Sequence, residues 1–139
     1  MSYGISAALQ AAIYQRLMAD AALTALVGAA IYDNAPSGTI LGTYVSLGPE
    51  DVRDRSDKTG YGALHMITIS VISDAAGFQV AKQVGAAVSD ALQGAQLVLS
   101  RGHLCYINFD RAVARRVGTG ETRRIDLRFH ARVEDAIGA

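Results

Sequence analysis

The sequence predicts an α+β fold, in which an N-terminal helix and a central helix cover a mostly antiparallel sheet. Three observations support this prediction. Two segments repeat hydrophobic residues at three- and four-residue intervals, which is typical of amphipathic helices. Other segments alternate hydrophobic and polar residues, which is typical of half-buried strands. The chain has 139 residues, a usual size for one core, so we expect residues 1–139 to form a single domain.

The first predicted helix starts near the N-terminus and presents one hydrophobic stripe. This stripe consists of Ile5, Leu9, Ala12, Ile13 and Leu17. A second, short helix is predicted to end near Leu26. Its start is indicated by Asp20, whose carboxylate can accept hydrogen bonds from the free amides of a first helical turn, and its end by Gly28.

A short strand is predicted at residues 30–32, followed by turn-forming residues at 34–38 and a second strand through Tyr44, Val45 and Leu47. We expect a long charged loop over residues 49–61, because that stretch has no hydrophobic periodicity. Such long loops are uncommon in compact domains and are often functional. Two interpretations are equally compatible with this stretch: a partner-binding arm and a solvated hairpin tip. The charged residues of this loop are Glu50, Asp51, Arg53, Asp54, Arg55, Asp57 and Lys58.

The middle of the chain predicts a strand followed by a long helix. Ile67, Ile69 and Val71 alternate with polar residues in the segment from 64 to 73. Hydrophobic residues at helical spacing follow from 78 to 92, and Gly94 suits the end of that helix. We expect the carboxylate of Asp74 to cap its start.

The last two predicted strands form an arginine-rich hairpin around a turn at residues 118–120. The first lies within residues 104–117, where broken alternation around 108–112 indicates a β-bulge. The second strand alternates cleanly. Its hydrophobic face consists of Ile125, Leu127, Phe129, Ala131 and Val133. Its polar face consists of Arg124, Asp126, Arg128, His130 and Arg132.

Half of the residues are hydrophobic and 19% are charged, which argues against a disordered chain. The formal net charge is zero, so net charge alone predicts no affinity for nucleic acid or membranes. The charge is uneven, however, because eight arginines lie between residues 101 and 132 while residues 1–100 are net acidic. The arginine row could follow nucleic-acid phosphates, but Asp126 interrupts it and no aromatic residue lies beside it to stack on bases. We therefore expect the arginines to pair with acids of a neighbouring copy.

The common catalytic and metal-binding motifs are absent: the sequence has no G-x-S-x-G, P-loop, H-E-x-x-H or paired C-x-x-C pattern. His103 and Cys105 are spaced to face one side of a strand, but two ligands without a third do not predict a metal site. We expect Cys105 to be buried and His130 to be solvated, and nothing near His65 indicates a general base. The sequence thus predicts no enzyme, no catalytic residue, no metal and no cofactor.

The N-terminus lacks the basic start and the hydrophobic run of a secretory signal. The most hydrophobic stretch, residues 21–32, is too short to span a bilayer. With a single cysteine, the chain also suits a reducing compartment. We expect a soluble protein made in the cytoplasm.

Five segments follow one another in an order that characterises a known family. They are residues 17–28, 31–36, 44–48, the strand end Ser73-Asp74 with Gly77, and residues 91–94. In this order they resemble the small tail-completion proteins of long-tailed phages and gene transfer agents, over nearly the whole chain. Four positions depart from the family pattern: Thr43 stands where a proline is expected, Ile72 where a tryptophan is common, and Arg123-Arg124 where Thr-His is more usual.

The resemblance implies a structural virion protein, a tail terminator whose copies form a ring, typically a hexamer. The ring would bind the last ring of tail tube protein, stop its polymerisation and join it to a head-neck connector or stopper protein. DNA would pass through the central channel without sequence-specific binding. The implied location is the neck end of the tail, in a virion or a gene-transfer-agent particle assembled in the bacterial cytoplasm.

A closed ring of identical subunits needs two different, complementary patches on each subunit. We expect these patches, or the contacts with other partners, to lie in the charged loop and the arginine-rich strand. The residues concerned are Glu50, Asp51, Arg53, Asp54, Arg55, Asp57, Lys58, Arg124, Asp126, Arg128 and Arg132. The alternative functions are another neck component, such as a connector or stopper, and a small ligand-binding module or enzyme.

Overall fold

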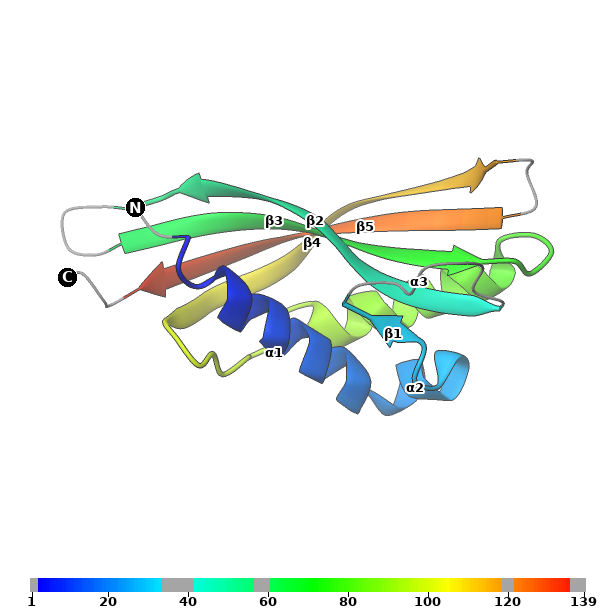
Figure 1. Ribbon diagram of the computed structural model, residues 1–139, viewed down its shortest axis with the longest axis horizontal. Helices are drawn as coiled ribbons and strands as arrows, with labels where there is room; N and C mark the ends of the chain where they lie inside the picture. The colour runs from blue at the N-terminus through cyan, green and yellow to red at the C-terminus, as the bar shows by residue number, and fades with distance from the viewer. Residues whose placement is uncertain (1–2, 34–41, 57–60, 119–121, 136–139) are drawn as a thin grey trace.

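The computed structural model describes residues 3–33, 42–56, 61–118 and 122–135. In these ranges it contains the helices α1 (Ser6–Ala19), α2 (Ala21–Val27) and α3 (Gln79–Leu92), and the strands β1 (Ile31–Tyr32), β2 (Thr43–Asp54), β3 (Tyr61–Ser73), β4 (His103–Val117) and β5 (Thr122–Asp135). The predicted α+β class with a mostly antiparallel sheet is confirmed (Figure 1). No helix in the described ranges is long and hydrophobic enough to cross a membrane.

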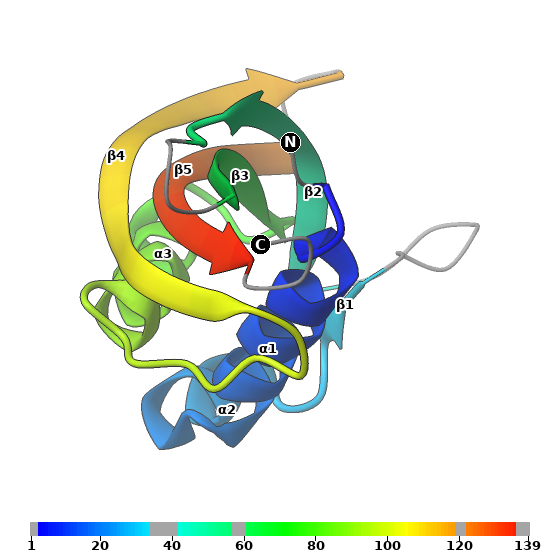
Figure 2. The same ribbon diagram turned by 90° about the vertical axis from the view of Figure 1, so that its left-hand side faces the viewer.

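The strands form one sheet in the order β1-β2-β3-β5-β4. β1 pairs with β2 in parallel at Val45 and Ser46, and the other neighbouring strands are antiparallel. The helices lie together on one face of the sheet (Figure 1). The sheet is coiled, so that β4 bends around β5 (Figure 2), and Pro49 of β2 lines the same hollow as Arg111 of β4. Because β1 pairs with only two residues of β2, most of β2 and all of β4 form the two long edges of the sheet.

The hydrophobic core lies between the helices and one face of the sheet. The hydrophobic face predicted for β5 is buried, and Phe129 at its centre has no exposed surface. From the helix layer, α1 contributes Leu9, Ile13 and Leu17. Burial of these side chains is the main stabilising contribution to the fold. The charged face of β5 points the other way, so the core is built on one face of the sheet.

α2 begins and ends as predicted. The carboxylate of Asp20 accepts a hydrogen bond from the N–H of Leu23 at 2.9 Å. Gly28 follows the helix with φ of 61°, a left-handed conformation that glycine adopts without steric cost. These two residues fix the short helix at its two ends.

The prediction of a long loop over residues 49–61 was wrong in its first half, because β2 continues to Asp54 and stays paired with β3. A register shift between Leu47 and Glu50 marks an irregularity in this strand. Such an irregularity interrupts the alternation by which a strand is recognised. Asp57 and Lys58, which belong to the predicted charged loop, lie outside the described residues.

The predicted cap of the central helix was also wrong. α3 begins after Phe78, whose side chain makes no capping hydrogen bond. The carboxylate of Asp74 instead accepts a hydrogen bond from the N–H of Gly42 at 3.0 Å. Asp74 therefore joins the end of β3 to the start of β2, because these antiparallel strand ends lie side by side.

β4 contains the predicted bulge and a second one. A register shift between Phe109 and Arg111 confirms the bulge expected around residues 108–112. Another shift separates Leu104 from Tyr106, on either side of Cys105. Cys105 is exposed and not buried, because this bulge lies in the strand at the side of the sheet, where a side chain has few neighbours.

Candidate assembly surfaces

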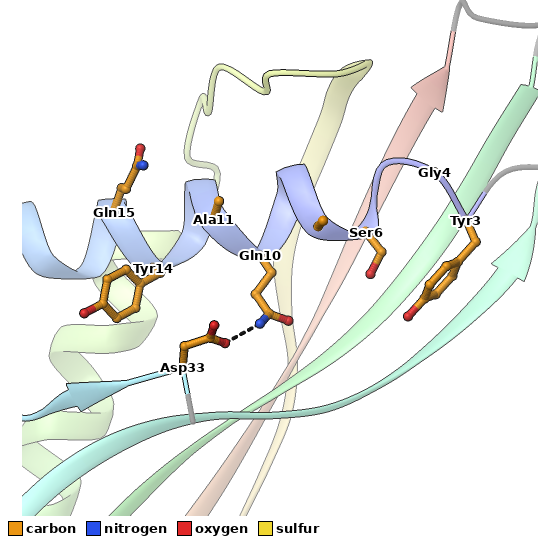
Figure 3. Close-up of a pocket in the computed structure, with 9 residues that line it drawn as sticks. Tyr3, Gly4, Ser6, Gln10, Ala11, Tyr14, Gln15 and Asp33 are labelled. Atoms are coloured by element: carbon orange, nitrogen blue, oxygen red, sulfur yellow. Dashed lines mark hydrogen bonds between the residues drawn. The ribbon is translucent and has the colours of Figure 1, made fainter. Parts of the chain in front are cut away.

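Glu50 joins the start of α1 to the sheet. One carboxylate oxygen accepts hydrogen bonds from the hydroxyls of Tyr3, at 2.7 Å, and Ser6. The other lies 3.3 Å from Nδ1 of His65, a side chain with no exposed surface. Figure 3 shows Tyr3 and Ser6 pointing from the N-terminal segment toward the strands. The first acid of the predicted charged loop therefore holds the N-terminal segment in place.

The contacts of Glu50 favour its charged form. Burial by itself would raise the pKa of Glu50, but hydrogen bonds from Ser6, Tyr3 and His65 together outweigh burial and lower that pKa below its ordinary value of 4.5. A carboxyl group whose pKa is lower in the folded than in the unfolded chain stabilises the fold above the unfolded pKa. That contribution is lost as the pH falls through the folded pKa.

We expect the free energy of unfolding to decrease as the pH falls below 4.5, and Glu50→Gln to remove part of this decrease. The variant has no carboxyl group at position 50 to protonate, so its stability should depend less on pH in this range. Urea denaturation of both proteins at several acidic pH values measures the effect. Two parallel profiles would show that Glu50 does not contribute to the acid sensitivity.

Asp126 organises two arginines on the face of the sheet opposite the helices. Its Oδ1 accepts hydrogen bonds from Ser70 Oγ at 2.6 Å and from Arg124 Nε at 2.9 Å. Its Oδ2 lies 3.4 Å from Nη2 of Arg115 on β4. Burial would raise the pKa of Asp126, but these hydrogen bonds and the arginine charge lower it overall. The aspartate that interrupts the predicted arginine row therefore holds arginines of both hairpin strands.

A second carboxylate acts in the same way. Asp110 accepts a hydrogen bond from Arg128 Nε at 2.6 Å and lies 3.3 Å from Nε2 of His130. Farther along β5, Nη2 of Arg132 donates to the backbone carbonyl of Arg55 at 2.8 Å. The predicted arginine face is present, but its arginines are largely engaged within the subunit.

The predicted interface residues thus fall into two structural groups. Asp51, Arg53 and Asp54 are exposed on β2, whereas the predicted residues of β5 lie on a strand enclosed between β3 and β4. Arg111 and Arg116 of β4 belong to the arginine-rich region expected to attract a neighbouring copy, but they were not among the predicted interface residues. Both are exposed, and neither forms a hydrogen bond or ion pair within the described ranges. The sequence feature that could have identified them is the basic composition of their segment, in which a bulge breaks the alternation of hydrophobic and polar residues.

Hollows lie beside both long sides of the sheet. One hollow of about 650 Å³ runs along α1 and is also lined by Tyr3 and Asp33, and a hydrogen bond from Gln10 to Asp33 lies at it (Figure 3). A hydrophobic groove of about 270 Å³ separates α3 from Phe109 and Ala112 of β4. On the opposite face of the sheet, a hollow of about 480 Å³ is lined by arginines of β4 and β5.

The described residues contain no group of three His, Cys, Asp or Glu side chains arranged to hold a metal ion. His103 and Cys105 are both exposed on β4. The features that stand out are charged strand edges and the hollows beside them, and these suit contacts with other proteins.

Comparison with known proteins gives a family match and several matches to solved structures. The family described as Tail completion protein gp17 matches residues 11–134. A chain from a structure described as "Virion of native gene transfer agent (GTA) particle" is 65% identical, with a TM-score of 0.91, over 96% of this chain and 99% of that chain. No curated protein matches the sequence. The family match contains β2 and all of β5 except its last residue, and these strands carry most of the predicted interface residues.

Proposed function

This chain belongs to the family of tail completion protein gp17, and from that premise we propose that it is a tail terminator. Copies of it would form a ring on the last ring of tail tube protein, stop polymerisation of the tube and present the other side of the ring to a head-neck connector. We propose a hexamer whose channel lets DNA pass without sequence-specific contacts. The location would be the neck end of the tail.

Family membership by itself makes the chain a structural protein of a phage-type tail. The prediction of a structural protein and not an enzyme is thereby confirmed, as is the predicted resemblance to tail-completion proteins. The terminator role, the ring and its partners go beyond family membership and form the content of the proposal.

The observation that carries the proposal is the match to a chain of a native gene transfer agent particle, at 65% identity over nearly the full length of both chains. At that identity and with a TM-score of 0.91 the two chains share their fold, so the same place in a particle is the simplest function for this chain. Tail completion requires a protein that binds the tube on one side and the neck on the other, which a ring of identical subunits provides.

We propose that the charged residues of β2 and β5, with those between β2 and β3, contribute the contacts of the ring. They are Glu50, Asp51, Arg53, Asp54, Arg55, Asp57, Lys58, Arg124, Asp126, Arg128 and Arg132. Several already have partners in the subunit. Asp126 holds Arg124, and Asp110 holds Arg128, so these guanidinium groups would meet a partner in fixed positions, with less side-chain entropy lost on binding.

The proposal is tested by removing the gene from cells that produce the particles. We expect tubes that exceed the normal length and remain separate from heads, because nothing ends polymerisation or joins the tube to the neck. Electron microscopy measures tube length and the fraction of joined particles, and a wild-type copy supplied in trans serves as the control. In particles made with a labelled protein, the label should lie at the junction of head and tail.

Two other outcomes would exclude the terminator role. Tubes of normal length that fail to join heads, with the label at the junction, would indicate a connector or stopper protein. A label at the far end of the tail would place the protein outside the neck altogether.

A further inference from the structure

The outward edge of β4 consists of a covered part and a free part. Near its middle, the carbonyl of Ile107 accepts a hydrogen bond from the N–H of Gly94 at 2.9 Å, and the side chain of Gln93 accepts one from the N–H of Phe109 at 2.7 Å. Beyond this point, β4 runs on to Val117 with β5 on one side. No hydrogen bond formed by the described residues reaches the other side of residues 110–117. This free edge can accept another strand.

The opposite side of the sheet has a second free edge. β1 covers β2 at Val45 and Ser46, and the strand then continues to Asp54 with β3 as its neighbour. Residues 50–54 have no second strand beside them in the described part of the chain. In the described part of the chain, two strand segments thus have an outer edge without a partner strand, and they lie at opposite edges of the sheet.

The two free edges carry opposite charge. Residues 110–117 contain three arginines and one aspartate, whereas residues 50–54 contain three acids and one arginine. Like charges opposite each other destabilise a strand pair, and opposite charges stabilise it. Pairing of two copies through the same edge is therefore disfavoured, and pairing of the basic edge with the acidic edge is favoured. Such head-to-tail contacts build closed rings or filaments, and not simple dimers.

The surfaces beside the edges also complement each other. On the helix side of the free β4 edge lies the hydrophobic groove beside α3, where Phe109 is 42% exposed. On the helix side of β2 lies the hollow along α1, where Tyr3 is 59% exposed (Figure 3). If two copies join their sheets edge to edge, with the helices of both copies on the same face, the hydrophobic groove beside α3 of one copy faces the hollow along α1 of the next. Joining the edges would then bury hydrophobic surface as well as backbone groups.

We propose that the occupant of the free β4 edge is a second copy of this chain: residues 110–117 of one subunit pair with residues 50–54 of the next, so that one sheet continues around the ring. This inference rests on the proposed function, since it describes how the terminator ring closes. It assigns a role in assembly to Arg111 and Arg116, for which the described part of the chain shows no hydrogen bond or ion pair, and it brings the acidic edge that contains Asp51 and Asp54 next to the strand that carries them.

Charge reversal in producing cells tests the pairing. We expect Arg111→Glu with Arg116→Glu, and separately Asp51→Arg with Asp54→Arg, each to reduce the number of joined particles at least about tenfold, because each places like charges across every subunit contact. The chain carrying all four substitutions restores opposite charges and should recover most of the joined particles. Asp90→Arg, on the exposed side of α3, is the matched control and should have no effect.

All four positions are exposed, so the variants should fold, and thermal unfolding of each purified protein checks this. Normal particles from either double variant would overturn the proposal. So would failure of the fourfold variant to recover particles although its unfolding temperature matches that of the wild type.

Cross-linking separates this inference from the proposed function. Val113 lines the arginine hollow on the face opposite the helices, and Asp51 points to the same face because its neighbour Val52 packs on the core. With Cys105→Ser, the pair Asp51→Cys and Val113→Cys should give a ladder of multimers when particles are treated with a short bis-maleimide, and each single cysteine should give no ladder. No ladder, with the label at the neck, overturns the edge pairing alone; a ladder with the label elsewhere overturns the terminator role alone.

Discussion

Phe129→Ala is expected to destabilise the protein by about 3–5 kcal/mol, the usual loss when a large buried aromatic residue is truncated. Phe129 has no exposed surface and lies in β5, between the two strands that pair with it. Its ring also contacts that of Phe109 edge to face, with ring centroids 5.9 Å apart and an angle of 76° between the planes. Because domains are stable by only about 5–15 kcal/mol, this one change should remove much of the stability.

Urea denaturation followed by circular dichroism measures the loss. Phe109→Ala is the matched control, because it removes the other ring of the same pair from a position that is 42% exposed. It should cost clearly less than the substitution of Phe129. Equal losses for the two variants would mean that the aromatic contact, and not the buried position of Phe129, accounts for the effect.

Gly102→Ala is expected to cost several kcal/mol through two separate effects. Gly102 has φ of 76°, where a residue with a side chain is strained by about 1–3 kcal/mol. An added Cβ would also lie 2.4 Å from Cδ1 of Ile5 and 2.8 Å from the carbonyl oxygen of Glu134. Forcing extra atoms into such a closely packed site costs about 1–3 kcal/mol more.

Gly118→Ala separates the two effects. Gly118 has a similar φ of 65°, but no atom of the described residues lies within 4 Å of the place where its Cβ would be. This substitution should show the backbone strain alone, so the difference between the two variants in the free energy of unfolding measures the steric part. If both variants lost the same stability, the packing of Ile5 against the start of β4 would not be tight.

Elements with one buried face were predictable from the sequence. α1 and β5 each place hydrophobic residues at the period of their own backbone, because one face of each packs on the core. The cap of α2 was predictable for a different reason: Asp20 and the amide it accepts from are three residues apart, so the whole contact lies in one short segment.

The second half of β2 was not predictable in this way. Residues 50–54 are mostly charged because the strand lies at the side of the sheet, and the register shift after Leu47 removes the alternation. What makes this segment a strand is its pairing with β3, a tertiary contact that intrinsic propensity does not contain. The exposure of Cys105 was unpredictable for the same reason, since Cys105 lies at a bulge in β4, the strand at the other edge of the sheet.

The sequence predicts which segments of the candidate surfaces are charged, but it does not predict which residues contact each other. The acids of β2 and the arginines of β5 stand out in the sequence. The partners of Glu50 do not, because Tyr3 and Ser6 are 47 and 44 residues away along the chain. Likewise, nothing in the sequence indicates that Asp126 holds Arg124 and that Asp110 holds Arg128.

Because the hydrophobic core lies on one face of the sheet, the two faces of the sheet are subject to different evolutionary pressures. Ion pairs such as Arg53–Asp51 and Arg115–Asp126 are more than half exposed at their arginines, and exposed pairs of this kind contribute about 0–1 kcal/mol. Their loss or replacement leaves folding nearly unchanged. The charged side can therefore diverge along with the proteins that it meets in each particle, while substitutions on the helix side are removed by selection for a folded chain.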